Sequence, residues 1–232
     1  MKSTVRHAAL TRLALCRIAL IAIACCGVAG TRPAAAADSA AEPSLVVLGD
    51  SISAGYGIPL ASGWVALLGA RLKTTGYGYR VVNASVSGET TAGALARLAH
   101  VLDLHKPAVV LIELGGNDGL RGLPIAQTKA NLDRITAQIQ DSGSTPVIIG
   151  MRIPTNYGPV YTQQFADLYA QVAHARHVAL VPFLLARVAD DDANFQADRI
   201  HPIATVQPQL LDTVWPVLEP VLRQQRKSAS AR

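Results

Sequence analysis

A serine that follows a predicted buried strand is the first candidate for chemistry. Ser51 stands shortly after the apolar run Leu45–Leu48, within the sequence Gly-Asp-Ser-Ile-Ser. At the end of a strand its hydroxyl would project from the sheet edge, with backbone N–H groups beside it. A lone serine at such a place is more often a helix cap or a turn residue, so a nucleophile here requires a base nearby.

Asp198 and His201 are the candidates for that base. Their spacing of three residues allows the carboxylate to orient the imidazole from within one short turn. A histidine held in this way takes a proton from a serine hydroxyl and returns it to a leaving group. The other histidines after residue 37 fall on predicted helices or their ends, where we expect solvated side chains: His100, His105, His174 and His177.

Acyl transfer also needs hydrogen-bond donors aimed at the developing oxyanion. The backbone N–H groups of Ser51 and Gly88 and the side-chain amide of Asn117 are the candidates. Each follows a predicted strand, although an asparagine after two glycines also fits an ordinary turn.

Buried strands alternating with helices must bring these residues together. Short, continuous apolar runs are typical of buried parallel strands. This alternation predicts right-handed crossovers and a five-stranded parallel sheet inside a three-layer α/β/α domain. Ligands bind such sheets at the carboxyl ends of the strands. The predicted strands are Leu45–Leu48, Arg80–Asn83, Ala108–Leu114, Pro146–Gly150 and Ala179–Pro182.

Apolar residues at helical spacing predict the connecting helices. We expect Ser62 to cap the first and Thr90 with Thr91 to begin the second. The last helix should begin near Pro208, and Pro216 should kink it. The helical stripes span Trp64–Leu72, Leu95–Leu102, Ile125–Ile139, Phe165–Val172 and Leu211–Leu222.

The basic charge of the chain lies in its N-terminal segment. Of the 21 basic and 16 acidic residues, residues 1–37 carry five basic and no acidic ones, so residues 38–232 carry 16 of each. A nucleic-acid footprint needs basic charge in the folded domain, so we expect no nucleic-acid partner. The remainder fits one domain at residues 45–223, with a lead-in at 38–44 and a basic tail at 224–232.

Residues 1–37 are typical of a secretory signal peptide. A basic region up to Arg17 precedes the 13-residue uncharged run Ile18–Gly30, and small residues then predict cleavage after Ala37. Because about 20 residues are needed to span a bilayer, we expect a periplasmic or secreted protein without a stable membrane anchor. A lipoprotein with the lipid on Cys25 or Cys26 is the lesser alternative, because the preceding residues fit that signal poorly.

The chain holds three cysteines, all within this segment. The mature protein would therefore have no disulfide, no cysteine nucleophile and no thiolate metal site.

Four blocks in this order resemble the GDSL esterases, also called the SGNH hydrolase family. The resemblance spans Leu45–Leu222 and is strongest for the bacterial multifunctional thioesterase I/lysophospholipase/arylesterase group. The blocks are Gly49–Ser53, the loop around Gly88, Gly115–Asp118 and Asp198–Pro202.

The resemblance implies a flavodoxin-like fold and a serine esterase that needs no metal or cofactor. Ser51 would be the nucleophile, His201 the base and Asp198 the residue that orients it. Ser51, Gly88 and Asn117 would form the oxyanion hole. One departure is Arg199, which follows the acid where a small residue is more usual, and we expect it to face solvent or substrate.

The implied substrates are small acyl esters or lipids, among them aryl esters, lysophospholipids and fatty acyl thioesters. We expect Leu120, Ile153 and Pro154 to bring apolar side chains to the mouth of the site. The segment Val181–His201 looks short, which would alter the wall of the acyl pocket. The sequence does not determine the oligomeric state.

Two alternatives stay open at this point. A carbohydrate O-deacetylase of the SGNH type would use the same catalytic residues, so only substrates distinguish it. A phospho-receiver module on a similar sheet would use Asp50 and Asp118, but it needs an acidic pair after the first strand and a lysine after the fifth. The chain has Asp50-Ser51 and Pro182-Phe183 at those places.

Overall fold

Five parallel strands form a single sheet in the order β2-β1-β3-β4-β5. The structure is a computed structural model that describes residues 42–230, so the predicted signal peptide lies outside the described residues. This strand order is the flavodoxin-like one, as the sequence predicts. The strands are β1 (Ser44–Gly49), β2 (Arg80–Asn83), β3 (Val109–Glu113), β4 (Thr145–Ile149) and β5 (Ala179–Val181).

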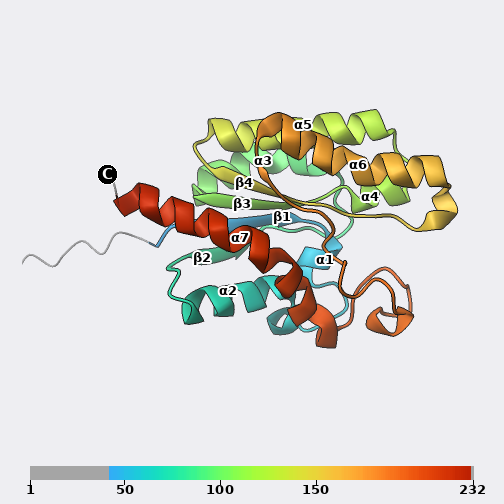
Figure 1. Ribbon diagram of the computed structural model, residues 1–232, viewed down its shortest axis with the longest axis horizontal. Coiled ribbons are helices and arrows are strands. Elements are labelled where there is room, and N and C mark those ends of the chain that lie inside the picture. Colours follow the sequence, from blue (N-terminus) through green and yellow to red (C-terminus); the bar gives the residue numbers. More distant parts are fainter. Residues whose placement is uncertain (1–41, 231–232) are drawn as a thin grey trace, which may run out of the picture. The chain divides into compact units, whose positions relative to one another are not determined.

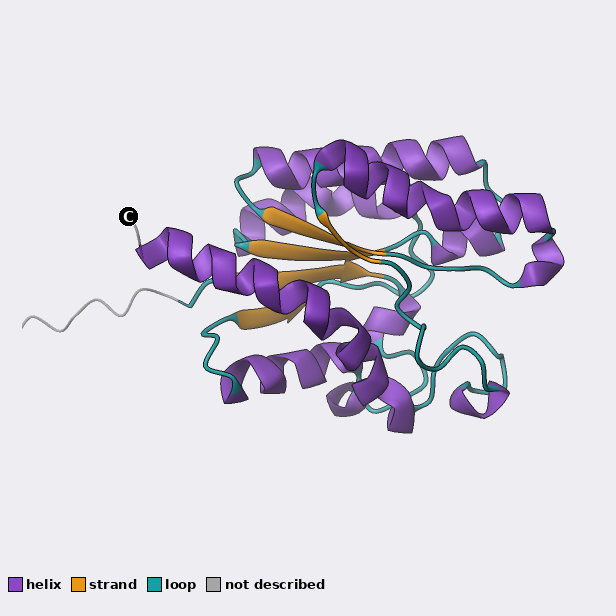
Figure 2. Ribbon diagram, in the orientation of Figure 1, coloured by secondary structure: helices purple, strands orange, loops and turns teal. Residues whose placement is uncertain are grey.

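Helices cover both faces of the sheet, which confirms the three-layer prediction. Three of them, α3 (Thr91–His105), α5 (Ile125–Asp141) and α6 (Pro159–Arg176), pack on one face, and α2 (Trp64–Thr74) and α7 (Gln207–Ser230) pack on the other (Figure 1). Figure 2 shows the strands between these two helical layers. Two short helices, α1 (Ser51–Ala54) and α4 (Gly116–Leu120), follow the carboxyl ends of β1 and β3.

The central strands are buried along their whole length, because helices lie above and below them. Every residue of β1 and β3 is buried. The parallel register pairs Gly49 at the end of β1 with Glu113 at the end of β3. The last residue of each central strand therefore lies next to the turn that contains Ser51.

The start of α2 differs from the prediction. Ser62 belongs to a short 3₁₀ helix, and Gly63 is the N-cap. The backbone N–H of Trp64 instead donates to the side chain of Gln207, at 3.1 Å. A glutamine from the last helix thus replaces the local cap that the sequence suggests. Thr90 does cap α3, since its hydroxyl accepts from Gly93 N at 3.2 Å.

The last helix is longer than predicted, because it runs through residues assigned to a basic tail. It contains both Pro216 and Pro220 and continues to Ser230. Gln225 anchors this extension, as its side-chain amide donates to the Thr145 hydroxyl at 2.6 Å. No helix among residues 42–230 is both long and apolar enough to cross a membrane.

Candidate active site

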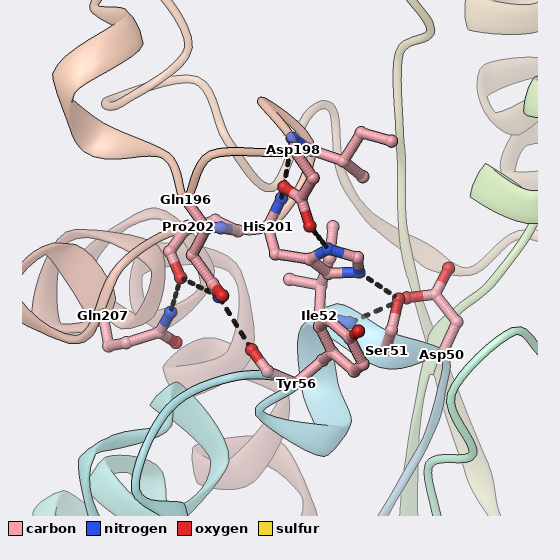
Figure 3. A network of polar contacts seen from close by, with 10 residues as sticks. Asp50, Ser51, Ile52, Tyr56, Gln196, Asp198, His201, Pro202 and Gln207 are labelled. Carbon is pink, nitrogen blue, oxygen red and sulfur yellow. Dashed lines mark hydrogen bonds and ion pairs between the residues drawn. The ribbon is translucent and has the colours of Figure 1, made fainter.

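Ser51, His201 and Asp198 form a continuous chain of hydrogen bonds (Figure 3). The Ser51 hydroxyl lies 2.8 Å from His201 Nε2, and His201 Nδ1 lies 2.6 Å from Asp198 Oδ2. Ser51 begins α1 directly after β1, whereas the other two residues lie between β5 and α7. The fold brings together residues 150 positions apart, as the sequence predicts.

A single helical turn positions Ser51. Asp50 is the N-cap of α1, and its Oδ1 accepts from Ile52 N at 3.0 Å. Gly55 adopts a left-handed conformation with φ of 77° and ends the helix after four residues. Because Ser51 is the first residue of this helix, its N–H lacks an intrahelical acceptor. The hydroxyl and the N–H are thus both available at the edge of the sheet.

The Asp198 side chain closes its own turn around His201. Its Oδ1 accepts from the backbone N–H groups of Ile200 and His201, at 2.9 and 3.0 Å. Partial burial raises the pKa of Asp198, but the hydrogen bonds from the His201 ring and from the two backbone N–H groups outweigh it and lower the pKa to about 2. An ionised carboxylate only accepts hydrogen bonds. The His201 proton therefore lies on Nδ1, and Nε2 is left to accept from Ser51.

Two residues that the sequence does not indicate hold this loop in place. Gln196 N donates to the carbonyl of His201 at 2.8 Å. Its side-chain amide donates to the carbonyl of Tyr56, also at 2.8 Å (Figure 3). The Tyr56 ring lies 4.5 Å from the His201 ring, measured between centroids, at 40°. The hydrogen bond from Gln196 to Tyr56 joins residues 140 positions apart, so no local spacing could have revealed it.

The residues of the three predicted oxyanion donors, Ser51, Gly88 and Asn117, line one cavity together with His201. Within residues 42–230, neither the Ser51 N–H nor the Gly88 N–H donates to a protein acceptor. Gly88 adopts φ of 78°, a left-handed conformation that favours glycine. The Asn117 amide donates one hydrogen to Asp50 Oδ2 at 3.2 Å. Its second amide hydrogen remains available, because a primary amide carries two.

The cavity has a volume of about 540 Å³, and apolar side chains form much of its wall. Leu120, Ile153 and Pro154 all line it, as the sequence predicts. A larger cavity of about 770 Å³ lies between α2 and β2 and contains neither Ser51 nor His201. We place the site at the smaller cavity, since the hydrogen-bonded chain opens into it. Phe183, Leu185 and Phe195 add to its apolar lining.

Asp118 has a structural part in this arrangement. Its carboxylate accepts from the backbone N–H and the hydroxyl of Thr91, at 2.9 and 2.5 Å. These bonds tie α4, which carries Asn117, to the first residue of α3. Asp118 is buried, so it is not placed as the exposed acceptor of a receiver module.

A hydroxyl, an imidazole and a carboxylate in this order, beside free backbone donors, form the arrangement that serine hydrolases use for acyl transfer. Comparison with known proteins shows which family of serine hydrolases the chain resembles. The GDSL-like Lipase/Acylhydrolase family matches residues 47–206, and the chain belongs to this family. It is a carboxylic ester hydrolase.

Curated relatives and a solved structure agree with this placement. The chain is 50% identical to Esterase TesA of Pseudomonas aeruginosa over 79% of its own length and 91% of the relative. It is 39% identical to Thioesterase 1/protease 1/lysophospholipase L1 of Escherichia coli K12, over 79% and 87%. A crystal structure of TesA superimposes with a TM-score of 0.75 at 50% identity, covering 76% of this chain and 98% of that one.

Arg199 is exposed to solvent and lies at the rim of the cavity that holds Ser51, in agreement with the expectation that it faces solvent or substrate. Its side chain is 76% exposed and lies 3.7 Å from Asp192 rather than against Asp198. Arg199 also adopts φ of 57°, a left-handed conformation that costs a non-glycine residue about 1–2 kcal/mol. Glycine, which lacks a Cβ, would relieve this strain.

Replacing Arg199 by glycine is therefore expected to leave the acidic limb of the kcat/KM–pH profile unchanged, because the guanidinium does not touch the Asp198–His201 pair. The melting temperature should change little, since relief of the strain offsets the larger entropy of glycine in the unfolded chain. The profile is measured with a neutral ester. A shift of about one pH unit, equal to about 1.4 kcal/mol, would show that the guanidinium is coupled to His201.

Proposed function

We propose that this protein hydrolyses acyl esters and thioesters through an acyl-enzyme on Ser51. His201 takes the hydroxyl proton as Ser51 attacks the carbonyl, and Asp198 stabilises the imidazolium that forms. The N–H groups of Ser51 and Gly88 and the amide of Asn117 bind the oxyanion. His201 then protonates the leaving alcohol or thiol, and a water that it activates releases the acid.

One observation carries this mechanism. The 2.8 Å and 2.6 Å bonds that join Ser51, His201 and Asp198 lie at the edge of a cavity with free N–H donors. The apolar wall of that cavity suits an aliphatic acyl chain, because each buried methylene contributes about 0.8 kcal/mol. The names of the relatives, which include esterase, thioesterase and lysophospholipase, support the same range of leaving groups.

Export, as the N-terminal segment predicts it, would limit which of these substrates the protein meets. We infer that residues 1–37 direct the chain out of the cytoplasm and that cleavage follows Ala37, because the basic, apolar and small-residue regions occur in the required order. Acyl-CoA is an intracellular metabolite, so exported protein would act on acyl esters such as lysophospholipids or aryl esters.

A series of nitrophenyl esters from acetyl to palmitoyl tests the acyl preference. We expect kcat/KM to rise from acetyl to medium-length chains, by up to about fourfold per buried methylene, and then to level off when the cavity is filled. The assay compares the purified protein with the Ser51→Ala variant as the blank. A steady preference for acetyl esters, together with release of acetate from acetylated glycans, would favour a carbohydrate deacetylase instead.

A further inference from the structure

Two buried carboxyl groups lie directly behind the proposed nucleophile. Asp50 is 3% exposed and Glu113 is fully buried. Within residues 42–230, neither forms an ion pair with a lysine, an arginine or a histidine. Two unpaired buried carboxylates would be very costly. The mechanism proposed above uses neither group, so their presence needs another explanation.

Only one of the two carboxyl oxygens of Glu113 accepts hydrogen bonds among the described residues. Its Oε2 accepts from the Ser53 hydroxyl at 2.6 Å and from Asp50 N at 3.3 Å. Its Oε1 is buried and has no hydrogen-bonding partner among residues 42–230. Burial, and then the charge of Asp50, raise the pKa of Glu113 well above its ordinary value. The side chains of Glu113 and Asp50 also interact with each other, so a proton on Glu113 would have the Asp50 carboxyl as its acceptor.

Asp50 carries the charge of the pair. Burial raises its pKa to about 6, against hydrogen bonds from Ile52 N, Glu113 and Asn117 and the nearby His201. One of its oxygens accepts from Ile52 N and caps the helix that begins with Ser51 (Figure 3). The other accepts from the Asn117 amide at 3.2 Å. Asp50 thus touches both the turn of the nucleophile and the side-chain donor of the oxyanion hole.

Glycines in two of the sequence blocks make room for the pair. A Cβ on Gly49 would lie 2.9 Å from Glu113 Oε2 and 2.7 Å from Ser53 Cβ. A Cβ on Gly116 would lie 3.1 Å from Asp50 Oδ2. A side chain at Gly49 would therefore force Glu113 or its neighbours to shift, which favours glycine there.

We propose that Asp50 and Glu113 share one proton and act as a positioning unit that aims the Asn117 amide at the substrate oxygen. The carboxylate accepts one amide hydrogen and so directs the NH₂ group, rather than the carbonyl, toward the site. The shared proton spreads the negative charge, which would otherwise oppose the developing oxyanion. This inference rests on the proposed function, because it assigns Asn117 to the oxyanion hole.

A double-mutant cycle tests the path from Asp50 through Asn117. Asn117→Ala should lower kcat for a nitrophenyl ester by about 10²–10³-fold with little change in KM. Asp50→Asn should lower kcat by about 10–100-fold, because an amide facing Asn117 no longer dictates its orientation. When Asn117→Ala is already present, adding Asp50→Asn should lower kcat by less than about threefold, because the amide that Asp50 orients is already gone.

The inference would be overturned if the double variant lost kcat by the product of the two single losses. Asp50 would then have only its structural role in capping α1. A wild-type kcat for Asn117→Ala would overturn it too. Failure of the proposed function is a separate result, namely ester hydrolysis by Ser51→Ala. Titration with a fluorophosphonate over a long incubation gives the concentration of folded sites, so unfolded protein does not enter kcat.

The shared proton is tested at Glu113. Glu113→Gln mimics the neutral acid, since its amide donates to Asp50 while its carbonyl accepts from Ser53. Glu113→Ala should lower kcat by about tenfold or more, and Glu113→Gln should recover it to within about threefold of the wild type. If the glutamine variant loses as much activity as the alanine variant at equal titrated site concentration, Glu113 acts as a carboxylate and the shared proton is ruled out.

Discussion

Ser51→Ala is expected to lower kcat for ester hydrolysis by about 10⁴–10⁶-fold while the protein stays folded. The change removes the oxygen that lies 2.8 Å from His201 Nε2, and with it the acyl-enzyme. Alanine is a good helix former, and the cap from Asp50 to Ile52 N does not involve the Ser51 side chain. We therefore expect an unchanged circular dichroism spectrum and a melting temperature within a few degrees of the wild type.

Covalent labelling gives the decisive measurement for Ser51. A fluorophosphonate should modify a single serine, located by mass spectrometry of the digested protein, and Ser51→Ala should not be labelled. Ser87→Ala is the matched control, because Ser87 is exposed and lines the same cavity. Labelling of Ser53, Ser85 or Ser87, combined with an active Ser51→Ala variant, would contradict the assignment of the nucleophile.

The strands were predictable because burial on both faces of the sheet requires a continuous run of apolar residues in each strand. β1 contains the apolar run Leu45–Leu48 and β3 the run Val109–Ile112, and polar, glycine-rich turns follow within a few residues. Parallel strands bring their carboxyl ends to one edge. Ser51, Gly88 and Asn117 could therefore be placed together without knowledge of any contact. Asp198 and His201 form their own turn, so their spacing alone indicated the pair.

Contacts between distant segments were not predictable, because the spacing of residues along the chain does not show which distant residues will meet. Gln207 takes over the capping of Trp64 from 143 residues away, so Ser62 is not needed as a cap. Gln196 reaches Tyr56 in the same manner. Glu113 gives a weak signal, since a charged residue at the end of an apolar strand is unusual. Its partner Asp50 could be identified only once the register of β1 and β3 was known.

The length of α7 shows a different limit. The stretch after residue 224 is basic and holds serine and alanine, a composition that fits a free tail as well as a helix end. The hydrogen bond from Gln225 to Thr145 connects this part of the helix to the first residue of β4. Both Pro216 and Pro220 lie within the helix, although proline in a helix interior costs about 3 kcal/mol. The apolar face of α7, which includes Leu211, offsets that cost by packing on the core.

Asp198→Asn is expected to lower kcat by about 10³–10⁴-fold with little change in KM. An asparagine oxygen can still accept from the backbone N–H groups of Ile200 and His201, as Asp198 Oδ1 does at 2.9 and 3.0 Å. The turn should therefore keep its shape. The asparagine NH₂ group would face His201 Nδ1, now 2.6 Å from a carboxylate oxygen.

A donor at that place moves the His201 proton to Nε2, because Nδ1 must then accept. Nε2–H cannot take the proton of Ser51, so the base is lost while the loop remains. Asp192→Asn is the matched control, since Asp192 is an exposed acid of the same segment that lies near Arg199 instead. It should keep the wild-type kcat for a nitrophenyl ester. If Asp198→Asn stays within about tenfold of the wild type, the carboxylate does not set the tautomer of His201, and the free imidazole is a sufficient base.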